Sequence, residues 1–426
     1  MQICCPGGNQ IHHTPELPRG SIVSYYTLYI LCIYPVILNF SIFNLSFKYL
    51  HMCNFCCNFA LQLSNSMKTN EYNGAEQIRQ MCAQAQHMVV VTHMSPDGDA
   101  LGSALGVKHS VQADCTVIVP NGFPDFLAWM PGAQDILIYD QHTSQADAAI
   151  QAADMIVCTD FHELKRIGAL GLQIQDKLNT CPTLPLAVID HHIVCDEAMS
   201  EVRAARPYAE VIDSASPSAS EIVYRIFRLG MSDSRLRDAA TCIYAGMMTD
   251  TGNFSFNSNR PEMYEIIGQL VAAGVDKDEV YNRVFNMWSA DRMRLVGYCL
   301  NRKMQLFPEY HLALIYLSRK ELYRYNFHAG DAEGIVNMPL QIKDVYYSCF
   351  MREDKVLPHE LERAAGEKIK VKISLRSQGD RPVNILAHDI FFGGGHKNAA
   401  GGEFYGPVAK AVEQFLRAYP QYLQKD

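Results

Sequence analysis

Positive charge is not in excess in this sequence of 426 residues, where 37 lysines and arginines stand against 45 aspartates and glutamates. A protein that gathers long nucleic acids over its whole surface needs an excess of basic groups, so this class of binder is disfavoured. Charged residues make up only 19% of the chain and hydrophobic residues 48%, which excludes a disordered chain and a coiled-coil rod. The length suits two or three domains.

Grouped cysteines are missing from most of the chain. Six of the 14 cysteines lie in the first 66 residues, and the others are scattered singly without a Cys-x-x-Cys spacing. A disulfide framework or a thiolate zinc site needs grouped cysteines. We therefore expect residues 67–426 to belong to a protein of a reducing compartment, with a cytoplasmic location.

Charge is nearly absent from residues 1–66, which contain only Glu16, Arg19 and Lys48. The uncharged run between Arg19 and Lys48 is long enough to cross a bilayer, so a membrane anchor is one interpretation. A second interpretation is an upstream extension, with the protein starting at Met67, where charge and helical periodicity begin. A metal site at the clustered cysteines of 53–57 is a third and weaker interpretation.

Short apolar runs alternate with stretches of helical length from residue 88 onward. Strands that are apolar throughout and separated by helices form a parallel sheet covered on both faces. Ligands and catalytic groups of such sheets gather beyond the carboxyl ends of the strands. Three of the runs end in His93, Asp160 or Asp190. The predicted strands lie at 88–93, 116–120, 136–140, 155–160 and 186–192.

A helical region follows over 217–305, in which 287–306 is predicted to be one long helix. A second alternating region begins near residue 310 and ends in a helix at 409–419. The sequence therefore predicts an α/β fold with two folded domains. We expect a parallel-sheet catalytic domain at 67–289, a helical connector at 290–308 and a smaller α/β domain at 309–426.

A first group of metal-binding side chains lies in THMSPDGDALG, which holds His93, Asp97 and Asp99 between a strand and a helix. Two carboxylates two residues apart, with an imidazole four residues before the first, suit a divalent cation. Gly98 permits the backbone bend that turns both acids inward. The alternative is that Asp97 and Asp99 only form a turn and cap the helix.

Three further segments carry the same kinds of side chain. In VIDHH, one imidazole can ligate a metal while the other faces the substrate, and the aspartate can orient the ligand. Mixed carboxylate and imidazole ligands favour Mn²⁺, with Mg²⁺ or Fe²⁺ as alternatives, over a thiolate zinc site. Together the segments predict a metal site at the sheet edge. Their residues are Asp160 in VCTDFHEL, Asp190, His191 and His192 in VIDHH, and Asp250 in the loop motif GMMTDTGNF.

These four motifs, in this order, resemble those of the DHH superfamily of phosphoesterases. The segment FFGGGHKNAAGG at 391–402 resembles the DHHA1 element that accompanies it. The likeness runs from about Met67 to the end and is greatest to the nanoRNase and pAp phosphatase type. It implies a DHH catalytic domain, a DHHA1 substrate-binding domain and an active site in the cleft between them.

The resemblance also implies a two-metal site. One ion would be held by His93, Asp97 and Asp160. The second would be held by Asp99, Asp160, His191 and Asp250, so that Asp160 bridges the two ions. Asp190 would orient the histidine pair, and His192 would contact the scissile phosphate as a catalytic residue.

The glycine-rich segment GGGHKNAAGG is a candidate substrate-binding element. Glycines let backbone N–H groups approach an anion, and lysine or histidine adds charge. The segment is neither a Gly-Lys-Ser/Thr phosphate loop nor a dinucleotide fingerprint, and a tight strand-to-helix turn is the alternative. In the resembled family this segment and the end of KISLRS hold the nucleotide. The implied substrate-binding residues are Arg376, Ser377, Gly393, Gly394, Gly395, His396, Lys397 and Asn398.

The implied function is Mn²⁺-dependent hydrolysis of short oligoribonucleotides to 5′-mononucleotides and of 3′-phosphoadenosine 5′-phosphate (pAp) to AMP. A phosphodiesterase of pApA or cyclic dinucleotides, and an exopolyphosphatase or pyrophosphatase, are alternative enzymes. A membrane-tethered nucleotide sensor without turnover is the alternative from a different class. A homodimer is expected, and long duplex nucleic acid is not an expected partner.

Overall fold

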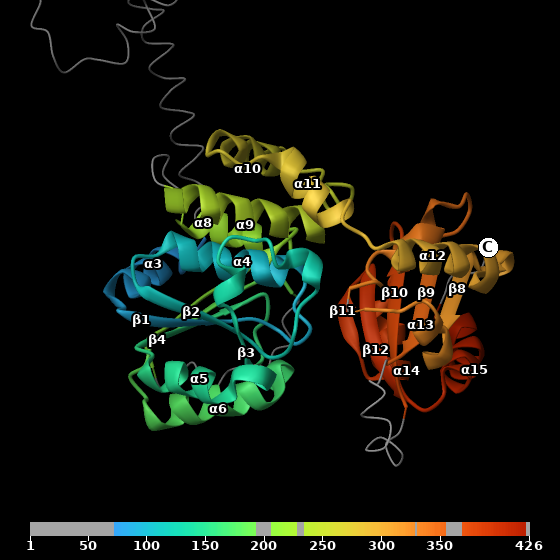
Figure 1. Cartoon of the computed structure of the whole chain (residues 1–426), viewed down its shortest axis with the longest axis horizontal. Helices are drawn as coiled ribbons and strands as arrows, with labels where there is room; N and C mark the ends of the chain where they lie inside the picture. The colour runs from blue at the N-terminus through green and yellow to red at the C-terminus, as the bar shows by residue number, and fades with distance from the viewer. Residues whose placement is uncertain (1–71, 193–205, 228–233, 329, 355–368, 423–426) are drawn as a thin grey trace, which may run out of the picture. The chain divides into compact units, whose positions relative to one another are not determined.

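The computed structural model describes residues 72–192, 206–227, 234–328, 330–354 and 369–422, and Glu71–Asp426 form one unit. The interpretations of residues 1–66 lie outside these ranges. None of the helices in the described part of the chain has the length and apolar character that crossing a bilayer requires. The predicted α/β fold is confirmed, with one parallel sheet and a second, mixed sheet (Figure 1).

The first sheet has six parallel strands in the order β3-β2-β1-β4-β5-β6. The first strand along the chain, β1, lies in the middle of the sheet, and β2 and β3 extend the sheet toward one edge. The chain then crosses back to β4, on the other side of β1, and β5 and β6 extend the sheet toward the opposite edge. Ligands of open parallel sheets bind where the strand order reverses in this way. The strands are β1 (His87–Val91), β2 (Asp114–Val119), β3 (Leu137–Ile138), β4 (Met155–Thr159), β5 (Leu186–Asp190) and β6 (Tyr208–Ile212).

Two predictions for this sheet need correction. The expected strand at 136–140 is reduced to two residues, because Tyr139 already begins helix α5 (Tyr139–Ala152). Strand β6 was not predicted, because its side chains alternate between buried and half-buried and do not form an apolar run. An edge strand covered less fully on its outer face has this pattern.

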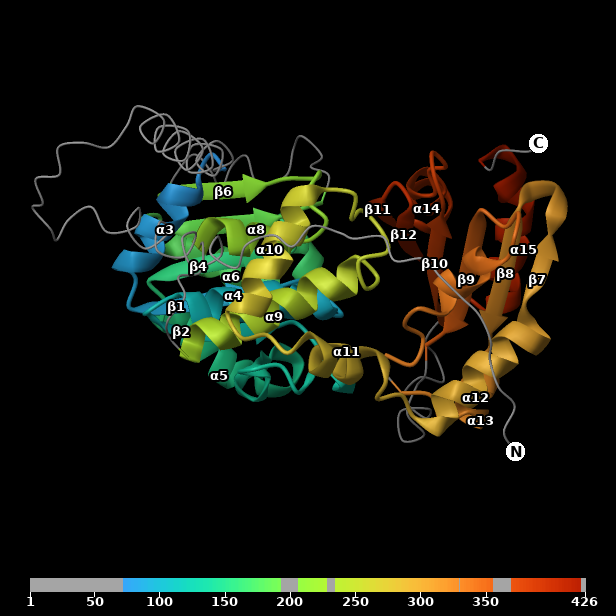
Figure 2. The ribbon, with the colours of Figure 1, turned by 90° about the horizontal axis from the view of Figure 1, so that it is seen from above.

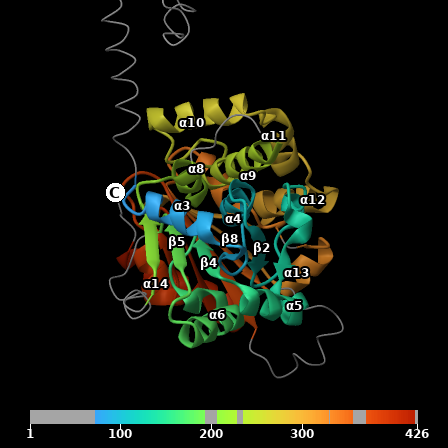
Figure 3. The same cartoon turned by 90° about the vertical axis from the view of Figure 1, so that its left-hand side faces the viewer.

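Helices cover both faces of the first sheet (Figures 1 and 3). The side chains of one face, such as Val90 and Val157, form a core with α3, α4, α8 and α9. The other face, with Val91 and Cys158, packs against α5 and α6. Helices α10 and α11 lie outside α8 and α9. The remaining bounds are α3 (Ala75–Gln84), α4 (Gly98–Ser110), α6 (Gly168–Thr180), α8 (Ala219–Phe227), α9 (Ser234–Asp250), α10 (Pro261–Ala272) and α11 (Lys277–Phe285).

Helices α4 and α9 pack backbone against backbone. A Cβ atom at Gly102 would lie 2.7 Å from the carbonyl oxygen of Cys242 and 2.8 Å from Cα of Gly246. Gly98 and Gly106 follow the same face of α4 and also lie against α9. Since residues four apart share one helix face, the three glycines form a continuous seam.

Filling this seam should destabilise the fold. We expect Gly102→Ala to lower the free energy of unfolding by about 1–3 kcal/mol, the usual cost of overpacking. Gly268 in α10 is the matched control, because a Cβ there would meet no atom within 4 Å. Gly268→Ala should raise stability by about 0.5–1 kcal/mol, since glycine is unfavourable inside helices. Urea denaturation followed by circular dichroism measures the free energy of unfolding of both variants. Equal changes in the two variants would contradict the close packing of α4 against α9 at Gly102.

The second sheet has the strand order β11-β12-β10-β9-β8-β7, in which only β8 and β9 are parallel (Figure 2). One face packs against α14 and α15 and the other against α12 and α13. The bounds are β7 (Gln305–Phe307), β8 (Leu312–Leu317), β9 (Tyr347–Glu353), β10 (Lys370–Ser377), β11 (Gly394–His396), β12 (Ala399–Tyr405), α12 (Ala290–Tyr298), α13 (Arg319–Arg324), α14 (Asn384–Phe391) and α15 (Val408–Ala418).

Two segments here differ from expectation. The single helix predicted over 287–306 begins at Ala290, changes to a π-helix at Cys299–Lys303 and is followed by β7. The glycine-rich segment is a hairpin between β11 and β12, not a strand-to-helix turn. Gly393 is required for packing, because a Cβ there would collide with the backbone of Gly401. The division into domains at 67–289, 290–308 and 309–426 stays a prediction.

Candidate active site

The strand ends around the crossover carry the predicted acids and histidines. His93 follows β1, Asp160 follows β4 and Asp190 is the last residue of β5. Asp97 caps α4, because its Oδ1 accepts hydrogen bonds from the backbone N–H groups of Asp99 and Ala100, both at 3.0 Å. The alternative prediction, that Asp97 caps the helix, is therefore confirmed. The side chain of Asp97 nevertheless also lies beside His93 and Asp160.

Asp99 is buried and is fixed by a second helix. Its two carboxylate oxygens accept hydrogen bonds from the backbone N–H groups of Ala219 (2.6 Å) and Ser220 (3.0 Å), at the start of α8. Free N–H groups at a helix start favour a negative charge. Asp250 is the last residue of α9, so its expected place in a loop at a strand end was wrong. Both acids reach the sheet edge through helices of the seam.

Asp160 lies between two imidazoles. Its Oδ2 is 3.2 Å from Nε2 of His93, and its Oδ1 is 3.2 Å from Nε2 of His191. The second contact is an ion-pair contact and not a hydrogen bond, so Oδ1 is buried without a hydrogen-bond partner in the described ranges. Asp160 also has a φ of 63°, a left-handed conformation that is sparse for side chains other than Gly, Asn and Asp. Aspartate is among the residue types that adopt this conformation readily, so the backbone can turn the carboxylate of Asp160 toward both imidazoles.

His191 is surrounded by carboxylates. Its Nε2 lies 3.2 Å from Asp160, 3.6 Å from Asp250 and 3.8 Å from Asp99. Four groups of three side chains have donor atoms within 4.8 Å of one another among the described residues, and three of them include Asp160. These groups are positioned to bind metal ions. Two of them fall within the ligand sets that the resemblance implies, and they consist of His93, Asp97 and Asp160, and of Asp99, Asp160 and His191. The other two contain His192, with Asp160 and Asp190 in one and with His191 and His396 in the other.

Burial and the close charges of neighbouring side chains shift the pKa values of these groups. Burial alone would lower the pKa of His93, but the hydrogen bond and charge of Asp160 raise it to about 9. Burial and the charge of Asp160 raise the pKa of Asp99 to about 7. The pKa of Asp160 is well below its usual range, because His191 and His93 outweigh the effect of burial. Protons therefore occupy part of the site in the absence of a cation.

Asp190 organises the adjacent histidines. Its Oδ1 contacts Nδ1 of His192 at 2.8 Å and accepts hydrogen bonds from the backbone N–H groups of His191 and His192. Its Oδ2 contacts Nδ1 of His162 at hydrogen-bonding distance. With Nδ1 of His192 held by Asp190, Nε2 is the atom left for a substrate.

His162 was missed in the sequence, although VCTDFHEL places it two residues after Asp160. It is buried and completes the hydrogen bonding of Asp190. We expect His162→Leu to lower kcat by about 10–100-fold through loss of this support, with little change in KM. His162→Gln keeps a donor and should recover part of the loss. Equal kcat values for the Gln and Leu variants would show that His162 only fills space.

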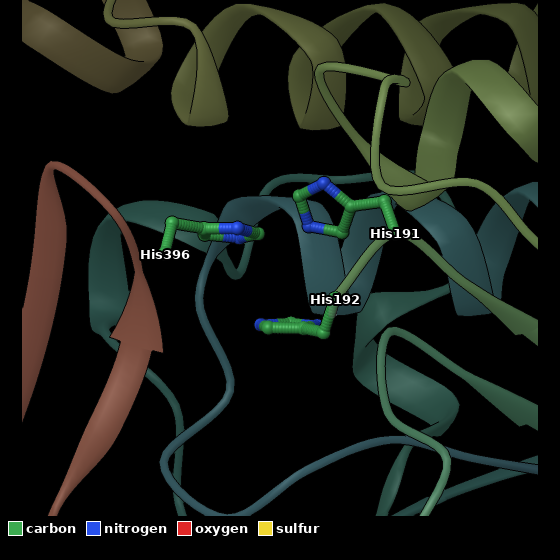
Figure 4. A group of neighbouring side chains, drawn as sticks. All are labelled: His191, His192 and His396. Atoms are coloured by element: carbon green, nitrogen blue, oxygen red, sulfur yellow. The ribbon is translucent and has the colours of Figure 1, made fainter. Parts of the chain in front are cut away.

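A third imidazole completes the cluster from the second sheet. His396 in β11 lies with its ring centroid 4.8 Å from His192, nearly parallel to it, and 4.9 Å from His191 (Figure 4). Burial and the two neighbouring histidines lower the pKa of His396 to about 4. His396 is therefore neutral at pH 7, so it adds a hydrogen-bonding group without adding charge.

Arg376 lies at the end of β10, within the electrostatic field of the acidic cluster. Its guanidinium donates a hydrogen bond to the carbonyl of Leu375 (3.0 Å). Burial lowers its pKa, and the charges of Glu333, Asp250 and Asp97 oppose this shift. Arg376 thus offers positive charge toward the acids from the second sheet.

The other predicted substrate contacts brace the turn after β10. The amide of Asn398 donates hydrogen bonds to Oγ of Ser377 and to the carbonyl of Gly379, both at 2.9 Å. The ammonium of Lys397 pairs with Asp380. Gly394 and Gly395 pair with β12 in the hairpin. Of this predicted set, His396 is the residue that the structure brings into contact with the histidine pair.

Comparison with known proteins identifies the family. The profile "DHH family, N-terminal domain" matches residues 87–247, and "DHHA1 domain" matches residues 312–425. The crystal structure of an exopolyphosphatase-related protein from Bacteroides fragilis is 42% identical, with a TM-score of 0.70, over 82% of this chain and 96% of that chain. The chain belongs to the DHH family. It is a DHH-family phosphoesterase with a DHHA1 domain.

Two curated relatives of this DHH-family chain carry the name bifunctional oligoribonuclease and PAP phosphatase NrnA. That of Thermus thermophilus is 24% identical over 341 residues, 79% of this chain and 90% of the relative. That of Bacillus subtilis is 23% identical over 323 residues, 75% of this chain and 89% of the relative. The resemblance inferred from the motifs is therefore confirmed.

Proposed function

We propose that the site binds two divalent cations, most favourably Mn²⁺, through the two donor groups that share Asp160. The observation that carries this proposal is the position of Asp160, which offers a separate carboxylate oxygen to each group, one of them buried without a hydrogen-bond partner. His93 and Asp97 complete one donor set. Asp99, His191 and Asp250 complete the other.

Bound together, such cations activate a water molecule and neutralise phosphoryl oxygens during in-line attack. The chain's own residues supply orientation and proton transfer. Asp190 holds the ring of His192 so that Nε2 contacts the scissile phosphate or its leaving oxygen. His396, neutral at pH 7, donates or accepts a hydrogen bond beside it, and Arg376 stabilises the charge of a second phosphate.

We propose that the substrates are oligoribonucleotides of about two to five nucleotides, released as 5′-mononucleotides, and pAp, which yields AMP. The two NrnA relatives support this class by name, and the net charge of −8 gives no basis for holding a long strand. A cytoplasmic homodimer stays part of this proposal. Two alternative activities could use the same metal site. One is hydrolysis of pApA or cyclic dinucleotides, and the other is hydrolysis of polyphosphate.

A substrate panel tests the proposal. The full chain is incubated with Mn²⁺ and pAp, pApA, oligoribonucleotides of two to eight nucleotides, cyclic di-AMP and polyphosphate, and kcat/KM is measured for each. We expect the highest values for pAp and the shortest oligoribonucleotides. A higher kcat/KM on polyphosphate or cyclic di-AMP would replace the proposed substrate class.

Cation binding should release protons. His93, with a pKa of about 9, is protonated at pH 7, and Asp99, with a pKa of about 7, is half protonated. Both must lose their protons to act as ligands, so apparent cation affinity should fall as the pH falls below 9. Titration calorimetry with Mn²⁺ in two buffers of different ionisation enthalpy counts the protons. His93→Gln should release about one fewer, and release of no protons by the unmodified chain would contradict the prediction.

A further inference from the structure

A basic and aromatic pocket lies beside the π-helix, apart from the metal-binding groups. It is a shallow, open pocket with a volume of about 670 Å³. None of its lining residues belongs to the acid and histidine groups of the active site. The lining comes from α12, the π-helix and the region of α13, and consists of Arg294, Gly297, Tyr298, Asn301, Arg302, Arg324 and Tyr325.

Part of the positive charge of the pocket has no ion-pair partner among the described residues. Arg294 pairs with Asp291 at 2.8 Å. Among the described residues, by contrast, no carboxylate lies within ion-pair distance of Arg302 or Arg324. Both side chains are exposed. Two guanidinium groups without an ion-pair partner among the described residues suit a phosphate, which arginine can bind through two parallel hydrogen bonds.

Two half-buried tyrosine rings line the pocket and pack against one another, so a flat ligand would use only the parts of the rings that face the pocket. The ring centroids of Tyr298 and Tyr325 are 5.0 Å apart, and the guanidinium of Arg324 lies 5.7 Å from the ring of Tyr325. The hydroxyl of Tyr298 donates a hydrogen bond to Glu321 (2.6 Å), which fixes the orientation of that ring. Nucleobases stack on aromatic rings of this kind.

Gly297 has no packing role that would explain it. It lies inside α12, where glycine is less favourable than alanine. A Cβ at this position would meet no atom within 4 Å. A larger side chain would therefore fit the fold, and the space that it would fill is the pocket itself. The π-helix that follows at Cys299–Lys303 contributes Asn301 and Arg302 to the lining, and π-helical turns are frequent at functional sites.

We propose that this pocket binds a nucleotide, with its phosphate on Arg302 and Arg324 and its base against the tyrosine rings. A free mononucleotide and the distal end of an oligonucleotide both offer this chemistry. The site needs neither cations nor turnover, so it stands independently of the proposed hydrolysis. An acidic peptide would use the guanidinium groups but not the rings.

The test measures binding of AMP to the full chain in the presence of EDTA, by calorimetry, so that the metal centre does not contribute. We expect Gly297→Leu to weaken AMP binding at least tenfold, because the side chain fills the pocket. Gly268→Leu is the matched control, since Gly268 is an equally open helix glycine in α10, and binding should be unchanged.

Charge reversal separates the phosphate from the base. Arg324→Glu should abolish AMP binding, whereas Lys320→Glu, an equal change at an exposed residue of the same helix outside the pocket, should not. Adenosine should bind more weakly than AMP and should not depend on Arg324. An acidic peptide that binds better than AMP, and loses that binding in Arg324→Glu, would replace the nucleotide as occupant and overturn the proposal.

The source of the nucleotide follows from comparing AMP with a pentanucleotide under the same conditions. If Gly297→Leu weakens the binding of AMP, the pocket is a site for free mononucleotides. If Gly297→Leu weakens only the binding of the pentanucleotide, the pocket is a site for the distal end of a longer substrate. If neither ligand distinguishes Gly297→Leu from Gly268→Leu, the proposal is wrong, whatever the enzyme hydrolyses.

Discussion

Asp160→Asn should lower kcat by at least about 1,000-fold, because it removes the one carboxylate common to both cation-binding groups. Asparagine is the suitable replacement, since it is enriched in the left-handed backbone conformation that Asp160 adopts, with φ of 63°. Alanine would confound the loss of the charge with backbone strain. The melting temperature should therefore stay close to that of the unmodified chain.

Metal analysis of the same variant distinguishes a bridging ligand from an orienting one. We expect Asp160→Asn to bind fewer than two Mn²⁺ ions per chain after dialysis. Asp176→Asn, at an exposed position of α6, is the matched control and should keep both metal content and activity. Full metal content together with low activity would mean that Asp160 acts on the substrate and does not bridge the ions.

His192→Gln should lower kcat by about 100–10,000-fold, the usual contribution of a positioned acid or base, while metal content stays close to normal. The expected separation follows from geometry. His191 has carboxylates of Asp99, Asp160 and Asp250 around its Nε2, whereas His192 directs Nδ1 to Asp190. A ring held in this way presents its other nitrogen outward.

His191→Gln is the matched variant for this experiment. It should lose a cation and activity together, because three carboxylates surround Nε2 of His191 and His191 belongs to the proposed ligand group with Asp99 and Asp160. If His192→Gln lost the cations and His191→Gln kept them, the roles of the two histidines would be reversed. Mass spectrometry of bound metal and steady-state kinetics on pAp give both readings.

Much of the fold follows from the sequence, because buried parallel strands are apolar runs whose ends are marked by polar residues. His93, Asp160 and Asp190 could be placed at one sheet edge for this reason. Asp250 could not, since it reaches the edge on a helix and the motif does not reveal where that helix ends. The position of Asp250 depends on how α9 packs in the folded protein, and this packing cannot be derived from a single sequence.

The remaining site residues show the same limit. His396 was identified by the glycine-rich motif, but its contact with His191 and His192 depends on a hairpin that pairs glycines across two strands. His162 has no motif of its own, and its function is defined by Asp190, 28 residues later. A histidine within a known motif is therefore visible in the sequence, and one that only supports another side chain is not.

The glycine seam between α4 and α9 has a consequence for the size of the ion. Asp99 lies at the start of α4 and Asp250 at the end of α9, so the spacing of the two helix axes sets how far apart these carboxylates are. Glycine backbones in contact give the smallest spacing that two helices can have. If Asp99 and Asp250 hold one ion, as proposed, we expect the close packing of the helices to favour oxygen distances of about 2.1 Å, as for Mg²⁺, over the 2.3–2.6 Å of Ca²⁺. A larger side chain at the glycines between α4 and α9, away from the ligands, should shift the preferred ion toward a larger radius.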